Sequence, residues 1–187
     1  MKKLLAFFIV LTALGTLSVS AMDLTSFPAA VSGSHALVNA GVGFGSARYG
    51  KMSIPPLTAT VDIPLALAGL PFSFGGMFGF TQSRWTYWGN DYLSYNVFVF
   101  GGRANYHINF GVNKLDTYAG LTLGWEMGTW GSNNNTDDSW LRYYGNYSAF
   151  HFGFQAGARY FFTNNIGAFA ELGYGLSYVK AGLALKF

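Results

Sequence analysis

A set of charged and titratable side chains recurs at alternate positions of otherwise apolar segments. Its members are Asp62, Arg103, His107, Glu126, His151, Arg159, Glu171, Lys180 and Lys186. Charges inside a narrow protein interior must be paired and hydrogen-bonded, because their desolvation is otherwise costly. The pattern therefore predicts a structural charge network, and its expected members are Glu171, Lys180, Arg159, Arg103, Glu126 and Asp62. An ion path through the interior is the alternative interpretation.

Histidine is the residue type on which to test for catalysis. Nucleophilic catalysis needs a nucleophile, a base and an orienting acid close together. His151, with Glu126 and Ser148, comes nearest to such a set. The chain has no cysteine, which excludes disulfides and thiolate metal sites, and the pair Asp137 and Asp138 is too small a cluster for a convincing calcium site. We expect no metal and no cofactor.

Aromatic residues are concentrated in the segment "SRWTYWGNDYLSYN", which we expect to form a long surface loop. They include Trp85, Tyr87, Trp88 and Tyr92. These rings could pack against one another within the loop. Alternatively, they could bind a host or environmental ligand, since Tyr and Trp make rigid amphipathic contacts.

The elements that must position these residues are β-strands, because apolar side chains recur with a period of two. In the last segment Val179, Leu183 and Phe187 alternate with Lys180 and Lys186. Eight such segments span residues 36–44, 57–65, 72–80, 98–110, 119–127, 150–162, 166–174 and 179–187. Their lengths are close to the 9–11 residues, roughly, that a transmembrane β-strand needs.

The two faces of these strands differ in bulk and charge. The apolar face carries no charge and is crowded with Phe, Tyr, Trp and Leu, whereas the other face is rich in Gly, Ser and Thr. A soluble ligand-binding barrel would point its apolar face inward. Eight strands enclose a lumen that side chains just fill, so the small residues suit the inside and the bulky residues the outside. We therefore predict an all-β, eight-stranded, antiparallel up-and-down transmembrane β-barrel.

Aromatic residues on the apolar face are sorted toward the two ends of the strands. One group is Phe44, Phe80, Phe98, Trp125, Phe150 and Tyr174, and the other is Phe72, Phe110, Phe162 and Phe187. Two such belts are typical of side chains at the two interfaces of a membrane.

The N-terminus predicts export across the inner membrane. Lys2 and Lys3 precede an apolar stretch that ends at Leu17, and small residues follow at 19–21. We expect residues 1–21 to be a signal peptide, 22–33 a periplasmic segment and 34–187 the barrel domain. An uncleaved membrane anchor is the alternative. A net charge of +3 on 187 residues gives no reason to expect binding to nucleic acid.

The segments "LDTYAGLTLGWE" and "FGFQAGARYFFTNNIGAFAELGYGLSYVKAGLALKF" resemble the small eight-stranded outer-membrane proteins of the OmpA/OmpX/OmpW type. The resemblance implies contact with outer-membrane lipid, periplasmic termini, and Phe187 as the signal read by the outer-membrane assembly machinery. It implies a structural or adhesin-like role with a plugged lumen, or an OmpW-like conduit for small hydrophobic molecules. The lipid A deacylases of this size class carry Ser or Thr two residues after a His, whereas Gly153 follows His151. We expect no enzyme activity.

The turns predict which interior charges meet. If Gly175-Leu176 is a two-residue hairpin turn, Glu171 lies directly opposite Lys180. A three-residue loop at 163–165 would place Arg159 diagonal to Glu171, within reach of a long side chain. Glu171 is thus predicted to be ionised between Arg159 and Lys180.

Overall fold

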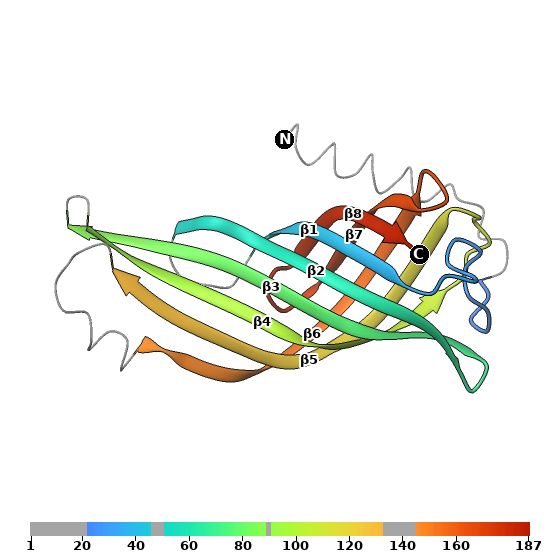
Figure 1. Cartoon of the computed structure of the whole chain (residues 1–187), viewed down its shortest axis with the longest axis horizontal. Helices are drawn as coiled ribbons and strands as arrows, with labels where there is room; N and C mark the ends of the chain where they lie inside the picture. Colours follow the sequence, from blue (N-terminus) through green and yellow to red (C-terminus); the bar gives the residue numbers. More distant parts are fainter. Residues whose placement is uncertain (1–21, 46–50, 89–90, 133–144) are drawn as a thin grey trace.

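The computed structural model describes residues 22–45, 51–88, 91–132 and 145–187, which form eight strands in one closed barrel (Figure 1). The strands are β1 (Leu37–Phe44), β2 (Lys51–Leu67), β3 (Leu70–Trp88), β4 (Asp91–Ile108), β5 (Leu115–Ser132), β6 (Tyr147–Phe161), β7 (Ile166–Tyr174) and β8 (Val179–Lys186). Neighbouring strands pair antiparallel, and β1 closes the sheet by pairing with β8 along its whole length. The predicted all-β, eight-stranded antiparallel barrel is confirmed.

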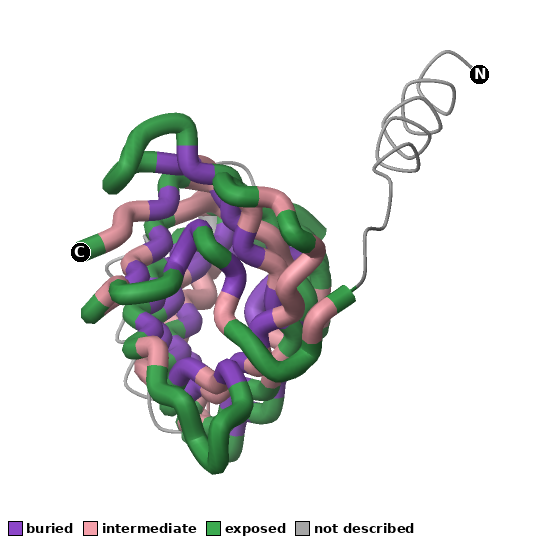
Figure 2. The backbone as a smooth tube through the Cα atoms, turned by 90° about the vertical axis from the view of Figure 1, so that its right-hand side faces the viewer, coloured by how far each residue is buried: buried purple, intermediate pink, exposed green. Residues whose placement is uncertain are grey.

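Side chains alternate between the two surfaces of the barrel, because successive residues of a strand point to opposite faces. Figure 2 shows this alternation of buried and exposed residues along the tube. Phe100 and Leu123 are 45% and 51% exposed, whereas Arg103 and Glu171 are 3% and 2% exposed. The predicted orientation, with bulky apolar residues outside and charges inside, is correct. In the described part of the chain, no helix has the length and apolar character needed to cross a membrane.

The strands of one half of the barrel are longer than predicted. β3 and β4 have 19 and 18 residues, whereas β7 and β8 have 9 and 8. The extra length lies at one end, where β3, β4 and β5 extend well beyond β7 and β8 (Figure 1). We call this the projecting end, and the end at which β8 finishes the terminal end.

The aromatic segment predicted as a loop is therefore mostly a β-hairpin. The ladder between β3 and β4 continues outward through Gln82–Asn96 to Trp85–Leu93 and Thr86–Tyr92. The loop prediction was wrong because Trp, Tyr and Thr favour extended backbone, and their alternation continues beyond the apolar band.

The tight turns set the registers at both ends. Ala68 and Gly69 join β2 to β3 with φ angles of 53° and 80°, as a two-residue hairpin with both central residues at positive φ requires. Between β7 and β8 the register is as predicted, with Glu171 opposite Lys180. The two-residue turn itself is wrong, because residues 175–178 leave the ladder and Leu176 folds into the barrel, where it is 1% exposed.

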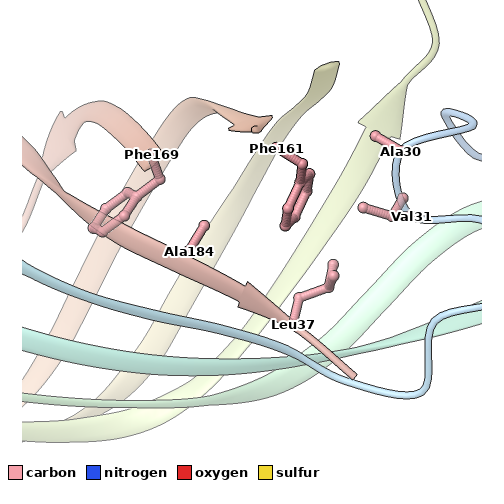
Figure 3. Packing of buried hydrophobic residues seen from close by; sticks show 6 residues of the cluster. All are labelled: Ala30, Val31, Leu37, Phe161, Phe169 and Ala184. Carbon is pink, nitrogen blue, oxygen red and sulfur yellow. The ribbon is translucent and has the colours of Figure 1, made fainter. Parts of the chain in front are cut away.

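A chain segment that precedes β1 covers the terminal end. Ala30 and Val31 belong to it, and they form an apolar cluster with Leu37, Phe161, Phe169 and Ala184 (Figure 3). Burying these side chains anchors residues 22–36 to the barrel, so the interior at this end is covered by the chain's own N-terminal segment.

Candidate functional site: the barrel interior and the projecting end

Arg159 of β6 binds acidic groups from two other strands. Its Nη1 donates to Asp116 Oδ2 at 2.7 Å, its Nη2 donates to Asp62, and its Nε donates to Asn39 Oδ1 at 3.0 Å. The guanidinium carbon lies 4.2 Å from the centroid of the Tyr118 ring. Arg159, Asp62 and Asp116 are all fully buried, so each charge depends on the others for solvation.

Glu171 of β7 forms the second part of the network. It accepts hydrogen bonds from Arg103 Nη2 at 3.1 Å, Tyr118 Oη at 3.0 Å and Lys180 Nζ. Arg103 Nε lies 3.0 Å from Asp62 Oδ1 as an ion pair, without hydrogen-bond geometry. Arg103 thus links Glu171 to the aspartate held by Arg159. Together with Asp116 and Lys180, these charged groups of β2, β4, β5, β6, β7 and β8 form one continuous network.

The predicted contact between Arg159 and Glu171 is wrong, although the register behind it is right. Arg159 does lie opposite Phe169, but its three guanidinium nitrogens bind Asn39, Asp116 and Asp62. The diagonal prediction considered only the β7 side of Arg159. Asp116 is directly opposite Arg159 on the other neighbouring strand, β5. Asn39 of β1 and Asp62 of β2 reach Arg159 across the narrow lumen.

Sequence reasoning missed Asp116 and Tyr118, which are both buried in the network. They occupy the next inward positions before Gly120 on β5, so extending that segment's alternation toward its turn would have found them. It also missed the amides that complete the network. Asn105 Nδ2 donates to Asp62 Oδ1 at 3.1 Å, and Gln155 Nε2 donates to Asn105 Oδ1 at 2.9 Å.

Ser73, His107 and Asp116 are arranged like a nucleophile, a base and an acid. His107 Nδ1 lies 2.6 Å from Asp116 Oδ1, and Nε2 lies 2.9 Å from Ser73 Oγ. All three residues are fully buried, and the Phe27 ring lies 5.4 Å from the imidazole. A substrate could not reach the hydroxyl in this state. The geometry therefore supports a buried hydrogen-bond relay that joins β3, β4 and β5.

The N-terminal segment is hydrogen-bonded over the terminal end. Asp23 and Asn109 exchange backbone hydrogen bonds of 2.9 and 3.1 Å, and Lys186 Nζ donates to Ala30 O at 2.6 Å. Hydrogen bonds from Ser26 and Thr25 lower the pKa of the exposed Asp23 carboxyl to about 2, so this carboxylate stays ionised at neutral pH.

The interior nearer the projecting end has a different composition. Met77, Val97, Val99 and Leu176 form a buried apolar cluster, with Tyr95 packed against it. The side chain of Glu126, predicted as part of the central network, lies beside Tyr147 and His151 of β6. Its carboxylate accepts a hydrogen bond from Tyr147 Oη, and His151 Nδ1 lies 3.3 Å away.

The predicted surface aromatics lie at the outer ends of β3 and β4. Trp85 is 58% exposed. Tyr87, Trp88 and Tyr92 lie within these strands, but their side chains fall outside the described residues, as do Asp137, Asp138 and the expected signal peptide. Within the described residues, no group of three or more His, Cys, Asp or Glu could hold a metal ion.

Comparison with known proteins gave no matching family model and no matching curated protein. Among solved structures, the chain is similar to Ail, the attachment invasion locus protein of Yersinia pestis, in complex with the heparin analogue sucrose octasulfate. That match has 12% identity and a TM-score of 0.44, covering 81% of this chain and 92% of that one. Another Ail structure matches with 14% identity and a TM-score of 0.35, covering 81% and 91%. At these values the likeness carries no functional argument, and the assignment of the fold rests on the strand pairing itself.

Proposed function

We propose that this chain is an integral outer-membrane β-barrel with a sealed lumen, which serves as an anchor for a surface-exposed, adhesin-like sheet. The observation that carries the proposal is the inverted distribution of side chains. Large hydrophobic residues such as Phe98, Leu121 and Phe154 are 37–51% exposed on the barrel wall, while Arg159 and Asp62 are fully buried inside. Such a wall is stable only against hydrocarbon.

Three layers of side chains support a sealed lumen. The N-terminal segment covers the terminal end, the charge network around Arg159 and Glu171 crosses the middle, and Leu176 packs beneath the projecting end. Desolvated, paired charges hold the central layer in place, because opening it would leave single charges buried.

The proposed surface role rests on the projecting strands. They continue the barrel ladder past Gln82 and Asn96 and carry Trp85 exposed near their tip. A paired hairpin with an exposed aromatic ring suits binding to a host or environmental ligand, since little side-chain entropy is lost on contact. A catalytic role is disfavoured because Ser73, the hydroxyl beside His107, is inaccessible.

In this proposal the terminal end faces the periplasm, and residues 1–21 are a signal peptide. Phe187 is 64% exposed beside the end of β8, where it is available to the assembly machinery. Its deletion should reduce outer-membrane levels far more than folded stability, because losing one exposed ring removes only about 1–3 kcal/mol of burial. Normal outer-membrane levels of the deletion variant would contradict this assignment.

The surface role is tested by shortening the hairpin. Replacing residues 86–92 with Asn-Gly should join the Trp85–Leu93 pair through a two-residue turn and leave the barrel intact. Cells that display the full-length protein should adhere to host-cell or abiotic surfaces, and cells with the short hairpin should lose that adhesion at equal surface levels. Equal adhesion by cells with either form would contradict the role of the hairpin. Absence of the full-length protein from outer-membrane fractions would contradict the membrane assignment.

A narrow conduit for small hydrophobic molecules is the second candidate. The ladder between β6 and β7 ends at Phe154–Tyr174, so in the described part of the chain residues 147–153 of β6 have no β7 neighbour. The apolar cluster around Leu176 lies at this level of the barrel. A conduit would require Leu176 to move, and Leu176→Ala would then increase uptake of a hydrophobic dye into proteoliposomes. Uptake equal to that of protein-free vesicles for both forms would exclude the conduit.

A further inference from the structure

Beyond the last apolar row of the barrel wall, the outer face of the projecting strands becomes polar. Phe98 of β4 lies beside Phe80 of β3 and Met127 of β5 in that last row. The next row outward on the same face consists of Gln82, Asn96 and Thr129. The Gln82 side chain donates to the Asn96 side chain at 2.7 Å. The change from apolar to polar side chains therefore occurs in the same row on all three strands.

The inner face of the same strands changes in the opposite sense. Within the barrel it carries buried polar side chains such as Arg103 and Thr122. At the projecting end, Tyr95 of β4 and Trp130 of β5 lie directly opposite each other, with ring centroids 4.5 Å apart. Tyr147 of β6 stacks on Tyr95 with a centroid distance of 6.1 Å. An antiparallel sheet with one polar and one apolar face ordinarily packs its apolar face against a partner.

Trp85 extends this surface toward the tip of the hairpin. It occupies the inner position of β3 that follows the buried Ser83, and it is 58% exposed. Tyr95, Trp130 and Tyr147 are half-buried. We refer to Trp85, Tyr95, Trp130 and Tyr147 as the inner aromatic face. Part of each of these four side chains is thus accessible at the projecting end.

Neighbouring groups hold the two tyrosine rings in place. Tyr147 Oη donates to the Glu126 carboxylate. A Cβ at Gly128 would collide with the Tyr147 ring and lie 2.7 Å from Tyr95 Oη, so glycine at this position permits the two rings to stack. A ligand that binds to rings already fixed in this way costs little additional side-chain entropy.

The arrangement of the rings narrows the chemistry of the ligand. The planes of Tyr95 and Tyr147 lie within 18° of each other, so these rings form a platform and not a cage around a cation. The carboxylate beside Tyr147 belongs to Glu126, whereas Lys51 and Arg84 occupy positions of the outer face. An anionic ligand would therefore meet repulsion at the inner face. A neutral ligand with a flat apolar side fits this surface best.

We propose that the inner aromatic face binds neutral sugar rings of glycans on the surface of another cell. One side of a pyranose presents C–H bonds, whose partial positive charge is attracted by the negative face of an aromatic ring. The sugar hydroxyls point outward from the edge of the pyranose. The exposed Asn146 lies at the edge of the aromatic surface, where its Oδ1 accepts a hydrogen bond from Trp130 N at 3.4 Å. A pyranose can thus stack on the rings while its hydroxyls bind water or the Asn146 amide.

The position of the inner aromatic face indicates the source of the sugar. This face turns toward the barrel axis, because side chains alternate between the two sides of a strand. Sugars on lipids of the same membrane would meet the polar outer face of the projecting strands. A glycan that approaches from above the membrane reaches the inner face directly. The inference rests on the proposed function and adds the class of ligand to the proposed surface role.

The test measures binding of the full-length barrel to an array of neutral, sialylated and sulfated cell-surface glycans. The protein is held in phospholipid nanodiscs, because the sugar headgroups of glycoside detergents would compete for the site. The variants are Trp130→Leu, Trp130→Phe and Trp85→Leu. Trp125→Leu is the matched control, because it makes the same change on the outer face of the same strand, where Trp125 is 45% exposed. Circular dichroism confirms that each variant is a folded barrel.

The wild type and Trp125→Leu should bind neutral glycans, and Trp130→Leu should bind them roughly tenfold more weakly. Trp130→Phe keeps an aromatic ring and should retain most of the binding. Trp85→Leu changes an exposed side chain near the hairpin tip, so the barrel should fold and bind severalfold more weakly even if Trp130→Leu does not fold.

Three results would overturn the proposal. The first is binding of neutral glycans by the wild type no stronger than by empty nanodiscs. The second is a preference for sulfated or sialylated glycans. The third is unchanged binding in Trp85→Leu, or equal binding by Trp130→Leu and either Trp125→Leu or Trp130→Phe.

The adhesion experiment with the shortened hairpin separates this inference from the proposed function. If shortening the hairpin removes adhesion but the wild type binds no neutral glycan, only the class of ligand is wrong. If the wild type binds neutral glycans but shortening the hairpin leaves adhesion unchanged, the proposed surface role fails and the sugar site remains.

Discussion

The two halves of the barrel interior are closed by different physical means. Toward the terminal end, Arg159 and Arg103 neutralise buried carboxylates within a wall of eight paired strands. Toward the projecting end, where β7 and β8 have already finished, Leu176 and its neighbours form a small apolar cluster. Buried ion pairs hold strands together where the wall is complete and solvent is excluded. At the mouth the apolar cluster lies beside the pair of Glu126 and His151, where nearby water weakens charge pairs and apolar packing contributes more.

The largest difference in stability between the two halves should follow from removing the central cation, Arg159. Arg159→Met should leave Asp62 and Asp116 without their shared partner and lower the free energy of unfolding by about 3–5 kcal/mol. Urea unfolding in detergent, followed by tryptophan fluorescence, measures this. Lys114→Met is the matched control, since it removes an exposed lysine at a turn. An Arg159→Met barrel that unfolds at the wild-type urea concentration would show that the network does not stabilise the fold.

The apolar half should respond less strongly. Leu176→Ala removes a side chain that is 1% exposed and should cost about 2–3 kcal/mol, toward the low end for buried leucine because the mouth can relax. Leu172→Ala, on the outer surface of the barrel at 62% exposure, should have almost no effect in the same unfolding experiment. If Leu176→Ala proved as costly as Arg159→Met, the two halves would not differ as described.

A smaller substitution tests the geometry of the network without removing a charge. A Cβ at Gly157 would lie 2.8 Å from Tyr118 Cζ and Oη and 2.9 Å from the backbone oxygen of Ala170. Gly157→Ala should therefore push this ring away from Glu171 and strain the β6–β7 ladder. We expect a loss of about 1–3 kcal/mol in the free energy of unfolding. Tyr118→Phe removes the hydroxyl, so its combination with Gly157→Ala should cost less than the sum of the two single changes. Strict additivity would indicate that the ring and Gly157 are not in contact.

The smallest effect is expected at a turn outside both halves. Ala68 has a φ of 53°, a conformation that costs an alanine about 1–2 kcal/mol. Ala68→Gly should relieve this strain but increase the entropy of the unfolded chain, leaving a net stabilisation of about 0.5 kcal/mol. A lower thermal stability for Ala68→Gly than for the wild type would contradict this account of the turn.

Local periodicity was enough to predict the strands, their faces and the opposition of Glu171 and Lys180. Asp116, directly opposite Arg159 on β5, was missed because the predicted segment began at residue 119. Asn39 and Asp62 could not be found in this way, because contacts across the lumen depend on the stagger of the whole barrel. The inward turn of Leu176 and the cover formed by Phe27 also lie in segments without periodic alternation. The length of the projecting strands was underestimated because the membrane limits the apolar band but does not limit strand pairing.

The most direct test of the sealed lumen is ion conductance of the full-length barrel in planar lipid bilayers. The charge network, the N-terminal cover and Leu176 together should leave the bilayer without steady single-channel steps at neutral pH. Reproducible, steady conductance steps from the folded wild-type protein would contradict the account, because a continuous water path could exist only if these layers do not close the barrel.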